Sequence, residues 1–200
     1  MNQLSPRTTH HDTRERILAT GEDLISGRGF SALGLSEILS AAAVPKGSFY
    51  HYFQSKEGFG VAMLERYFSD YHQNLRILFE DQSMTALQRL LTYFGNWQAM
   101  AERSECHKLC LAVKLAAEVA DLSEPMRAAL AVGMSGIIEQ ISQVVLTAQS
   151  EGSVSAKLDA TEIAESLYGM WVGASLLTKV NRQLRPLQLA LRQTEMLLQI

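Results

Sequence analysis

Apolar residues recur along most of the chain at the spacing of an α-helix. The first such stretch places a set of them on one helical face: Ile17, Leu18, Gly21, Leu24 and Ile25. Asp12 or Thr13 can cap the start of this helix, and Gly29 can end it in a left-handed turn. No stretch between residues 1 and 80 alternates as a β-strand does. The pattern therefore predicts an α-helical beginning.

Two short helices are expected next, over residues 35–42 and 46–53. The first ends where Val44 precedes Pro45, because a residue before proline is pushed out of the α conformation. Pro45 suits the start of the second, since its fixed φ fits a helix and its missing N–H costs nothing there. Ser55 is a good N-cap for a fourth helix over residues 56–80.

Longer helices are predicted over the rest of the chain, at 85–103, 107–120, 123–150, 159–181 and 186–198. The segment 151–153 is a turn. We therefore predict an all-α fold of about nine helices, with a natural boundary in the fourth, where short helices give way to long ones.

Composition narrows the class of protein. The 200 residues are 47% hydrophobic with a net charge of −3, which excludes general disorder. The two cysteines, Cys106 and Cys110, cannot build a secreted disulfide framework. The first residues lack the apolar stretch of a signal peptide, and no apolar run approaches the ~18 residues of a membrane span. We expect a soluble cytoplasmic protein with no membrane partner.

Because the chain has no excess of basic residues, evidence for DNA binding has to come from local sequence patterns. The two short helices after a longer one have the layout of a helix-turn-helix. Phe49 and Phe53 would pack inward, whereas Gly47, Ser48 and His51, flanked by Tyr50, would face outward. Small residues there let the backbone approach a groove, and Ser48 and His51 can reach base edges.

Lys46 and Lys56 add an electrostatic argument. Each falls in the first turn of a predicted helix, where the helix dipole disfavours a cation by about a few tenths of a kcal/mol. A phosphate would reverse that sign by pairing with the lysine and the exposed N–H groups. Either lysine alone is explained as an ordinary solvated side chain, but both together in this layout favour phosphate contacts.

The stretch from Ile17 to Phe59 resembles the DNA-binding domain of the TetR family of bacterial repressors. The resemblance is carried by Gly29-Phe30, Ile38, Val44, residues 46–53 and Ser55-Lys56-Glu57. It implies a homodimer in which residues 1–57 form the helix-turn-helix domain and residues 58–200 a helical sensing and dimerisation domain. The DNA contacts it implies come from Lys46, Gly47, Ser48, Tyr50, His51 and Lys56.

Three positions depart from the family pattern. Gly34 stands where Thr or Ser is usual, Ala43 replaces a turn glycine, and Pro45 replaces a capping Ser. The first two should loosen the motif slightly, and none removes a group that faces the groove. In a two-fold dimer the recognition helices stand about 34–36 Å apart, which predicts a palindromic double-stranded operator.

The segment 106–114 leaves three interpretations open. Free cysteines are often buried and behave as small hydrophobic residues. A metal site would use Cys106, His107 and Cys110, but His107 would point off the face that the sulfurs share. A reactive thiol is favoured if a helix starts near Cys106, because its positive end, with Lys114 and His107 nearby, would lower the pKa of Cys110.

A wider resemblance bears on this choice. Residues 110–127, together with 44–52, 60–66 and 167–179, are similar to electrophile-responsive repressors of the same family. The resemblance implies that Cys110 is the sensing cysteine. Cys106 has no counterpart and remains an extra thiol that can resolve an oxidised Cys110 only against helix geometry. Lys179 either faces a pocket, where it would stabilise the thiolate and capture an oxidised sulfur, or simply lies at a helix end that favours a cation.

We therefore expect a non-enzymatic repressor that leaves DNA when Cys110 is modified by an electrophile or oxidant, with no cofactor or metal. One alternative is a repressor released by a non-covalent ligand in a helical pocket, with Cys110 as inert core. Another is an enzyme with a Cys–His nucleophile built on His107, for which no third orienting group is readable.

Overall fold

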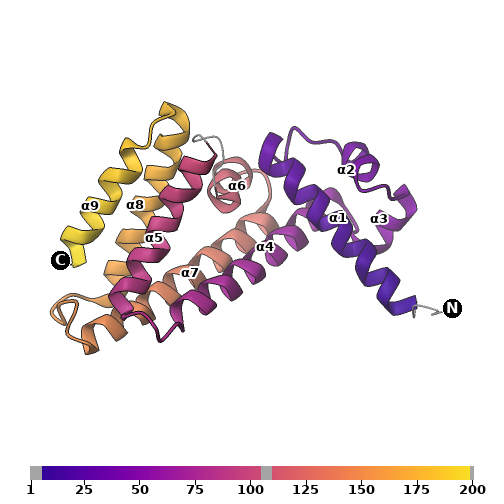
Figure 1. Cartoon of the computed structure of the whole chain (residues 1–200). Coiled ribbons are helices and arrows are strands. Elements are labelled where there is room, and N and C mark those ends of the chain that lie inside the picture. Colours follow the sequence, from indigo (N-terminus) through magenta and orange to yellow (C-terminus); the bar gives the residue numbers. More distant parts are fainter. Residues whose placement is uncertain (1–5, 105–109, 199–200) are drawn as a thin grey trace. The chain divides into compact units, whose positions relative to one another are not determined.

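The computed structural model of the chain describes residues 6–104 and 110–198, with side chains from residue 13 onward. Within these residues every regular element is helical, which confirms the all-α prediction (Figure 1). The helices are α1 (Pro6–Arg28), α2 (Leu35–Ala41), α3 (Lys46–Tyr52), α4 (Lys56–Phe79), α5 (Ala86–Arg103), α6 (Leu111–Val119), α7 (Glu124–Ser150), α8 (Ala160–Asn181) and α9 (Arg185–Leu198).

Most helix boundaries follow the capping residues seen in the sequence. The hydroxyl of Ser55 accepts from the N–H of Gly58 at 2.9 Å, and Asp159 accepts from the N–H groups at the start of α8. Two predicted starts are wrong. Helix α1 begins at Pro6, ahead of the predicted caps Asp12 and Thr13, and the described part of α6 begins at Leu111 rather than 107.

The described chain forms two compact units that interleave along the sequence. Unit 1 combines the residues up to Phe68 with Lys114–Ala131, and unit 2 combines Ser69–Val113 with the residues from Val132 onward. Helices α4, α6 and α7 therefore each contribute to both units. The predicted boundary between residues 57 and 58 divides the chain into two consecutive stretches. The compact units of the structure are instead each assembled from two separate segments.

The core of unit 1 is aromatic and closely packed. Phe49 and Phe59 are fully buried, with ring centroids 5.8 Å apart, and Phe53 lies 5.2 Å from Phe49. On α1, a Cβ added to Gly21 would lie 2.3 Å from the ring of Phe59. Glycine at this position therefore allows α1 and α4 to approach each other closely. Phe59 of α4 also packs against Phe49 of α3, so this approach helps to position α3.

The turn between α2 and α3 contains a strained residue. Ala43 has a φ of 51°, in the left-handed region that costs a non-glycine residue about 1–2 kcal/mol. The turn is nevertheless closed by the N–H of Val44, which donates to the carbonyl of Leu39 at 3.0 Å. The strained φ of Ala43 agrees with the expectation that replacing the usual turn glycine loosens the motif slightly.

A carboxylate on α6 holds the corner that follows α1. Glu118 accepts from the backbone N–H of Phe30 at 3.0 Å and of Ser31 at 2.6 Å. Nearby, the ammonium of Lys114 donates to the carbonyl of Ser26 at 2.7 Å, close to the end of α1. These contacts attach the α6 segment to the rest of unit 1.

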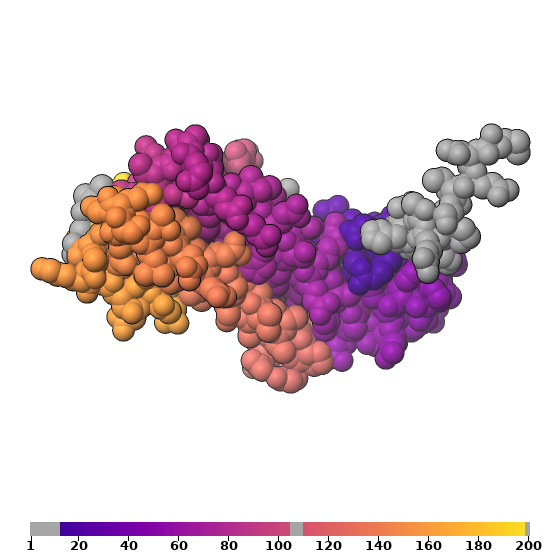
Figure 2. All heavy atoms as spheres, turned by 90° about the horizontal axis from the view of Figure 1, so that it is seen from below, coloured from indigo at the N-terminus to yellow at the C-terminus, as the bar shows by residue number. Residues whose placement is uncertain are grey.

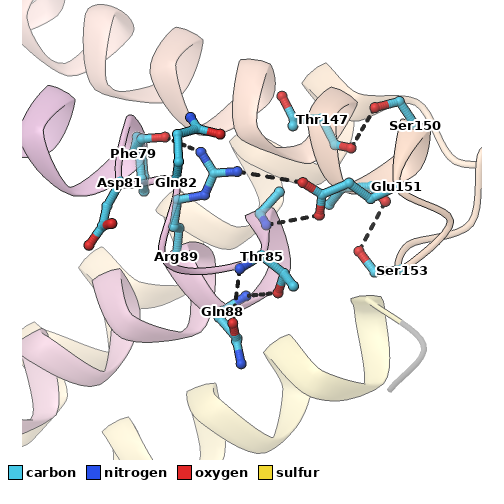
Figure 3. A network of polar contacts seen from close by, with 12 residues as sticks. Phe79, Asp81, Gln82, Thr85, Gln88, Arg89, Thr147, Ser150, Glu151 and Ser153 are labelled. Carbon is cyan, nitrogen blue, oxygen red and sulfur yellow. Dashed lines mark hydrogen bonds and ion pairs between the residues drawn. The ribbon is translucent and has the colours of Figure 1, made fainter.

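In unit 2, a buried arginine joins the ends of three helices. The guanidinium of Arg89 donates to the carbonyl of Phe79 at the end of α4 and lies 3.6 Å from Glu151, just after α7 (Figure 3). Glu151 also accepts from the N–H of Ala86 at 2.9 Å, at the start of α5. In Figure 2 the orange surface of this end of α7 adjoins the magenta surface of α5.

Helix α7 corrects one expectation about apolar runs. We expected no apolar run long enough to span a membrane, but the length of α7, 27 residues, and its mean hydropathy also fit such a span. One face is buried within the protein through residues that include Met126, Ile137, Ile141 and Val145. We interpret α7 as a core helix, because a single helix of this kind is equally typical of a soluble protein.

We predict that Glu118→Ala lowers the free energy of unfolding by about 1–2 kcal/mol at pH 7, because two backbone N–H groups lose their charged acceptor. Burial alone raises the pKa of Glu118, but the N–H groups of Ser31 and Phe30 outweigh it and lower that pKa below 4.5. The contribution is therefore present above pH 4.5 and is lost as the pH falls through the lowered value.

Urea unfolding at pH 7 and at successively lower pH values measures this difference. The exposed residue Glu65 on α4 supplies the control, since Glu65→Ala should change stability by less than about 0.5 kcal/mol. An effect of Glu118→Ala that never diminished as the pH was lowered, down to acid unfolding, would contradict the electrostatic explanation.

Candidate functional site

The outward face of α3 carries the residues predicted to contact DNA. Lys46, Gly47 and His51 are exposed, Tyr50 is 49% exposed, and Ser48 is half-buried. On the opposite side, Phe49 packs into the core, where its ring meets Tyr50 edge-on at 5.5 Å. The structure thus brings these five residues onto one accessible surface.

Gly47 faces open space. A Cβ added there would meet no atom of the described chain within 4 Å, in contrast to Gly21 on α1. The packing of this chain therefore gives no reason for glycine at position 47. Close approach by the backbone of a partner, as in a DNA groove, supplies one.

The two lysines differ in their surroundings. Lys46 is exposed, with its ammonium 5.9 Å from the ring centroid of Tyr50. The ammonium of Lys56 donates to the carbonyl of Phe30 at 2.7 Å and lies 4.6 Å from the centre of that ring. Burial lowers the pKa of Lys56, although the charge of Glu118 opposes this. Lys56 thus has a structural role, and its phosphate contact stays a prediction.

A second site surrounds Cys110 in unit 2. The cysteine is only 9% exposed and directly precedes Leu111, the first residue of α6. The N-terminal end of a helix favours an anion, so this position suits a thiolate. Cys106 and His107 lie outside the described residues, as do the metal and enzyme interpretations that need them. The described part of the chain contains no group of three or more metal-ligating side chains.

Cys110 lines a small cavity between α5, α8 and α9. The other lining residues that matter here are Trp97, Ala101, Ser175, Thr178 and Lys179. The cavity volume of about 10 Å³ is that of a single water-sized occupant. Lys179 fits both expectations for it, since it lies in the last turn of α8 and lines this cavity with Cys110.

Three tyrosines form another part of these surroundings. Burial raises the pKa of Tyr71, and the negative charge of an ionised Cys110 raises it further; the same two causes act on Tyr168. The hydroxyls of Tyr71 and Tyr93 lie 3.0 Å apart. The phenols therefore stay neutral and act as polar neighbours of the thiol.

Thr178 is a residue that sequence reasoning missed. Its side chain is 2% exposed, and its hydroxyl has no hydrogen-bond partner among the described residues. A buried hydroxyl without a partner costs about 1–3 kcal/mol. No spacing rule links Thr178 to Cys110, because the two residues come from segments that only the fold brings together.

The large aromatic residues of α8 lie in the core of unit 2. Trp171 is fully buried and stacks on Phe94 at 5.0 Å, with its indole N–H donating to Thr194 at 2.9 Å. Tyr168 is also buried, whereas Leu176 is 45% exposed. A separate groove of about 550 Å³ lies along α4 and α7, with His72, Arg76 and Glu139 in its lining.

Two family profiles match the chain. Residues 17–63 match the bacterial regulatory proteins of the tetR family, and residues 86–194 match the tetracyclin repressor-like C-terminal domain. The first match contains α2 and α3, and the second contains the cavity beside Cys110.

Individual relatives agree with these matches. The transcriptional repressor NemR of Escherichia coli is 45% identical over 183 residues, covering 92% of each chain. The regulator AcuR of Cereibacter sphaeroides is 34% identical over 86% of this chain and 78% of its own. The solved structure of reduced Escherichia coli NemR has a TM-score of 0.85 at 44% identity, covering 92% of this chain and 96% of that one. The chain therefore belongs to the TetR family and is a NemR-like transcriptional repressor with a DNA-binding helix-turn-helix.

Proposed function

We propose that this protein is a cytoplasmic repressor that releases its operator when Cys110 is modified by a reactive electrophile or oxidant. The observation that carries the proposal is the pairing of a buried thiol with Lys179 around one small cavity, at the residue where α6 begins. The similarity to NemR supports the same assignment.

The DNA-binding half of the proposal rests on the outward face of α3. Base readout comes from Gly47, Ser48 and His51, and phosphate contacts come from Lys46, Tyr50 and Lys56. The exposed positions of these residues, Ser48 and Lys56 apart, support the assignment. The binding partner is a palindromic double-stranded operator, since two recognition helices related by a two-fold axis read two half-sites.

A homodimer seam on α8 and α9 completes this arrangement. A Cβ added to Gly169 or Gly173 would meet nothing within 4 Å, so a second helix can approach α8 closely there. Three large apolar residues of the same two helices, Leu177, Val180 and Leu189, are also exposed, at 53%, 70% and 40%. Apolar surface of this kind supports burial against a second copy.

The chemistry at Cys110 follows from its position. The thiolate either attacks the carbon of an electrophile, or loses two electrons to an oxidant and becomes a sulfenic acid. The amine of Lys179 can then attack the oxidised sulfur, so that an S–N bond forms and water leaves. The adduct or linkage repacks the sensory helices and changes the spacing of the recognition helices in the dimer.

A second candidate function is release by a non-covalent ligand. The groove along α4 and α7 favours it, because its volume of about 550 Å³ lies within the range of small-molecule sites. The cavity beside Cys110 is far too small for such a ligand. Under this alternative the thiol is inert, which separates the two functions experimentally.

We predict that Lys46→Ala weakens DNA binding similarly for all sequences and lowers the salt dependence by about one phosphate contact. His51→Ala should instead reduce the preference for the operator over a scrambled duplex, by roughly 1–3 kcal/mol, because a base contact is lost. Fluorescence anisotropy with duplexes from the region flanking its own gene measures both, with the exposed Lys157→Ala as control.

We predict that Cys110→Ser keeps operator binding but abolishes release by a stoichiometric electrophile or oxidant. Serine preserves the size of the side chain and removes the nucleophilic sulfur. A mobility shift with and without the reagent checks this, and Cys106→Ser should respond as the wild type does. Release of the Cys110→Ser protein would favour the ligand-induced alternative.

We predict that Lys179→Ala slows the alkylation of Cys110 at neutral pH by about tenfold, because the thiolate loses a nearby cation that stabilises it. The rate of thiol labelling at neutral pH measures this loss, and induction should weaken in parallel. Lys157→Ala again serves as the control. Unchanged reactivity and unchanged induction would reduce Lys179 to a favourable charge at a helix end.

A further inference from the structure

We propose that Thr178 holds the oxygen of an oxidised Cys110 by donating a hydrogen bond to it, and that it thereby stabilises the sulfenic acid of this thiol. The proposal rests on the assignment of Cys110 as the sensing thiol. It adds a positioning residue that determines how long the oxidised product of the site persists.

The first observation is the state of the Thr178 hydroxyl. A threonine within a helix commonly donates to the carbonyl four residues earlier. Thr194 does so to Ala190 at 2.8 Å, and Thr147 does so to Gln143 at 2.9 Å. The Thr178 hydroxyl has no such partner among the described residues, although only 2% of the residue is exposed. Its proton is therefore available to another acceptor.

The second observation is where Thr178 lies. Thr178 and Cys110 line the same cavity, together with Lys179 on the next position of α8. The volume of about 10 Å³ matches a single oxygen atom with its proton. A larger group would extend beyond this volume.

The oxidation step balances with hydrogen peroxide as the oxidant. The thiolate of Cys110 attacks one peroxide oxygen, so that an S–O bond forms and the O–O bond breaks. The sulfur loses two electrons to the peroxide, and the departing hydroxide takes a proton and leaves as water. The sulfenic acid carries one additional oxygen, which the cavity accommodates and to which the Thr178 hydroxyl donates.

This geometry separates the two kinds of reagent. An added oxygen gains a hydrogen bond from a group that otherwise lacks one, whereas an alkyl adduct exceeds the cavity and gains no such bond. Thr178 should therefore lengthen the lifetime of the sulfenic acid without affecting how fast the thiol is alkylated.

The test compares Thr178→Val, which keeps the shape but removes the hydroxyl, with Thr178→Ser, which keeps the hydroxyl. All proteins are full-length and carry Cys106→Ser, so that Cys110 is the single thiol. Hydrogen peroxide is the oxidant. Intact mass spectrometry and dimedone trapping follow the species with one added oxygen, and labelling with N-ethylmaleimide across pH follows thiol access and ionisation.

We expect Thr178→Val to shorten the lifetime of the sulfenic acid by about five- to tenfold, the effect of one hydrogen bond, and Thr178→Ser to restore it. The pH profile of alkylation should be the same in all three proteins. Thermal stability of the reduced valine variant should not fall, because the hydroxyl it lacks has no hydrogen-bond partner in the described part of the chain.

Equal lifetimes in the wild type and in Thr178→Val would overturn the proposal, as would a parallel change in alkylation, which would indicate altered packing. If the background protein forms no sulfenic acid at all, the assignment of Cys110 as an oxidant sensor fails with it. The two failures are distinguishable, because in the first case Cys110 is oxidised and in the second it is not.

Discussion

Three helices contribute to both compact units, and the shortest of them, α6, constrains how a signal at the thiol can act. Helix α6 starts directly after Cys110 in unit 2, and its later turns place Glu118 against the N–H groups of Phe30 and Ser31 in unit 1. Leu111 and Glu118 are about 10 Å apart along a helix axis. Because a helix is stiff over so short a distance, a shift of its first turn is shared by Glu118. The chemistry proposed for Cys110 therefore has a covalent route to the corner that follows α1.

Much of the fold was predictable because helix periodicity and capping are local properties. Ser55 caps the start of α4 as predicted, and Gly29 adopts the expected left-handed φ of 94°. The start of α1 was missed because Thr13 resembles a cap but lies inside the helix. Interleaved units cannot be deduced from a change in helix length, since the pairing of Lys114–Ala131 with the N-terminal segment depends on contacts distant in sequence.

The two sites differ in how far the sequence could reveal them. The DNA-contacting face of α3 is contained in seven consecutive residues, so spacing alone indicated which side chains face outward. The surroundings of Cys110 come from α5, α8 and α9. Lys179 stands out in the sequence because it is the single charged residue between Ser166 and Asn181, whereas Thr178 has no such contrast with its neighbours. A buried hydroxyl stands out only when the structure shows that it has no hydrogen-bond partner among the described residues.

The left-handed Ala43 has a consequence for the recognition helix. Ala43 keeps this unfavourable backbone conformation only while the packing around it enforces that conformation. The orientation of α3 therefore depends on the aromatic cluster packed beneath it and is not set by the turn alone. Partial melting of that cluster would let the turn relax, so operator affinity should fade early on warming, before global unfolding.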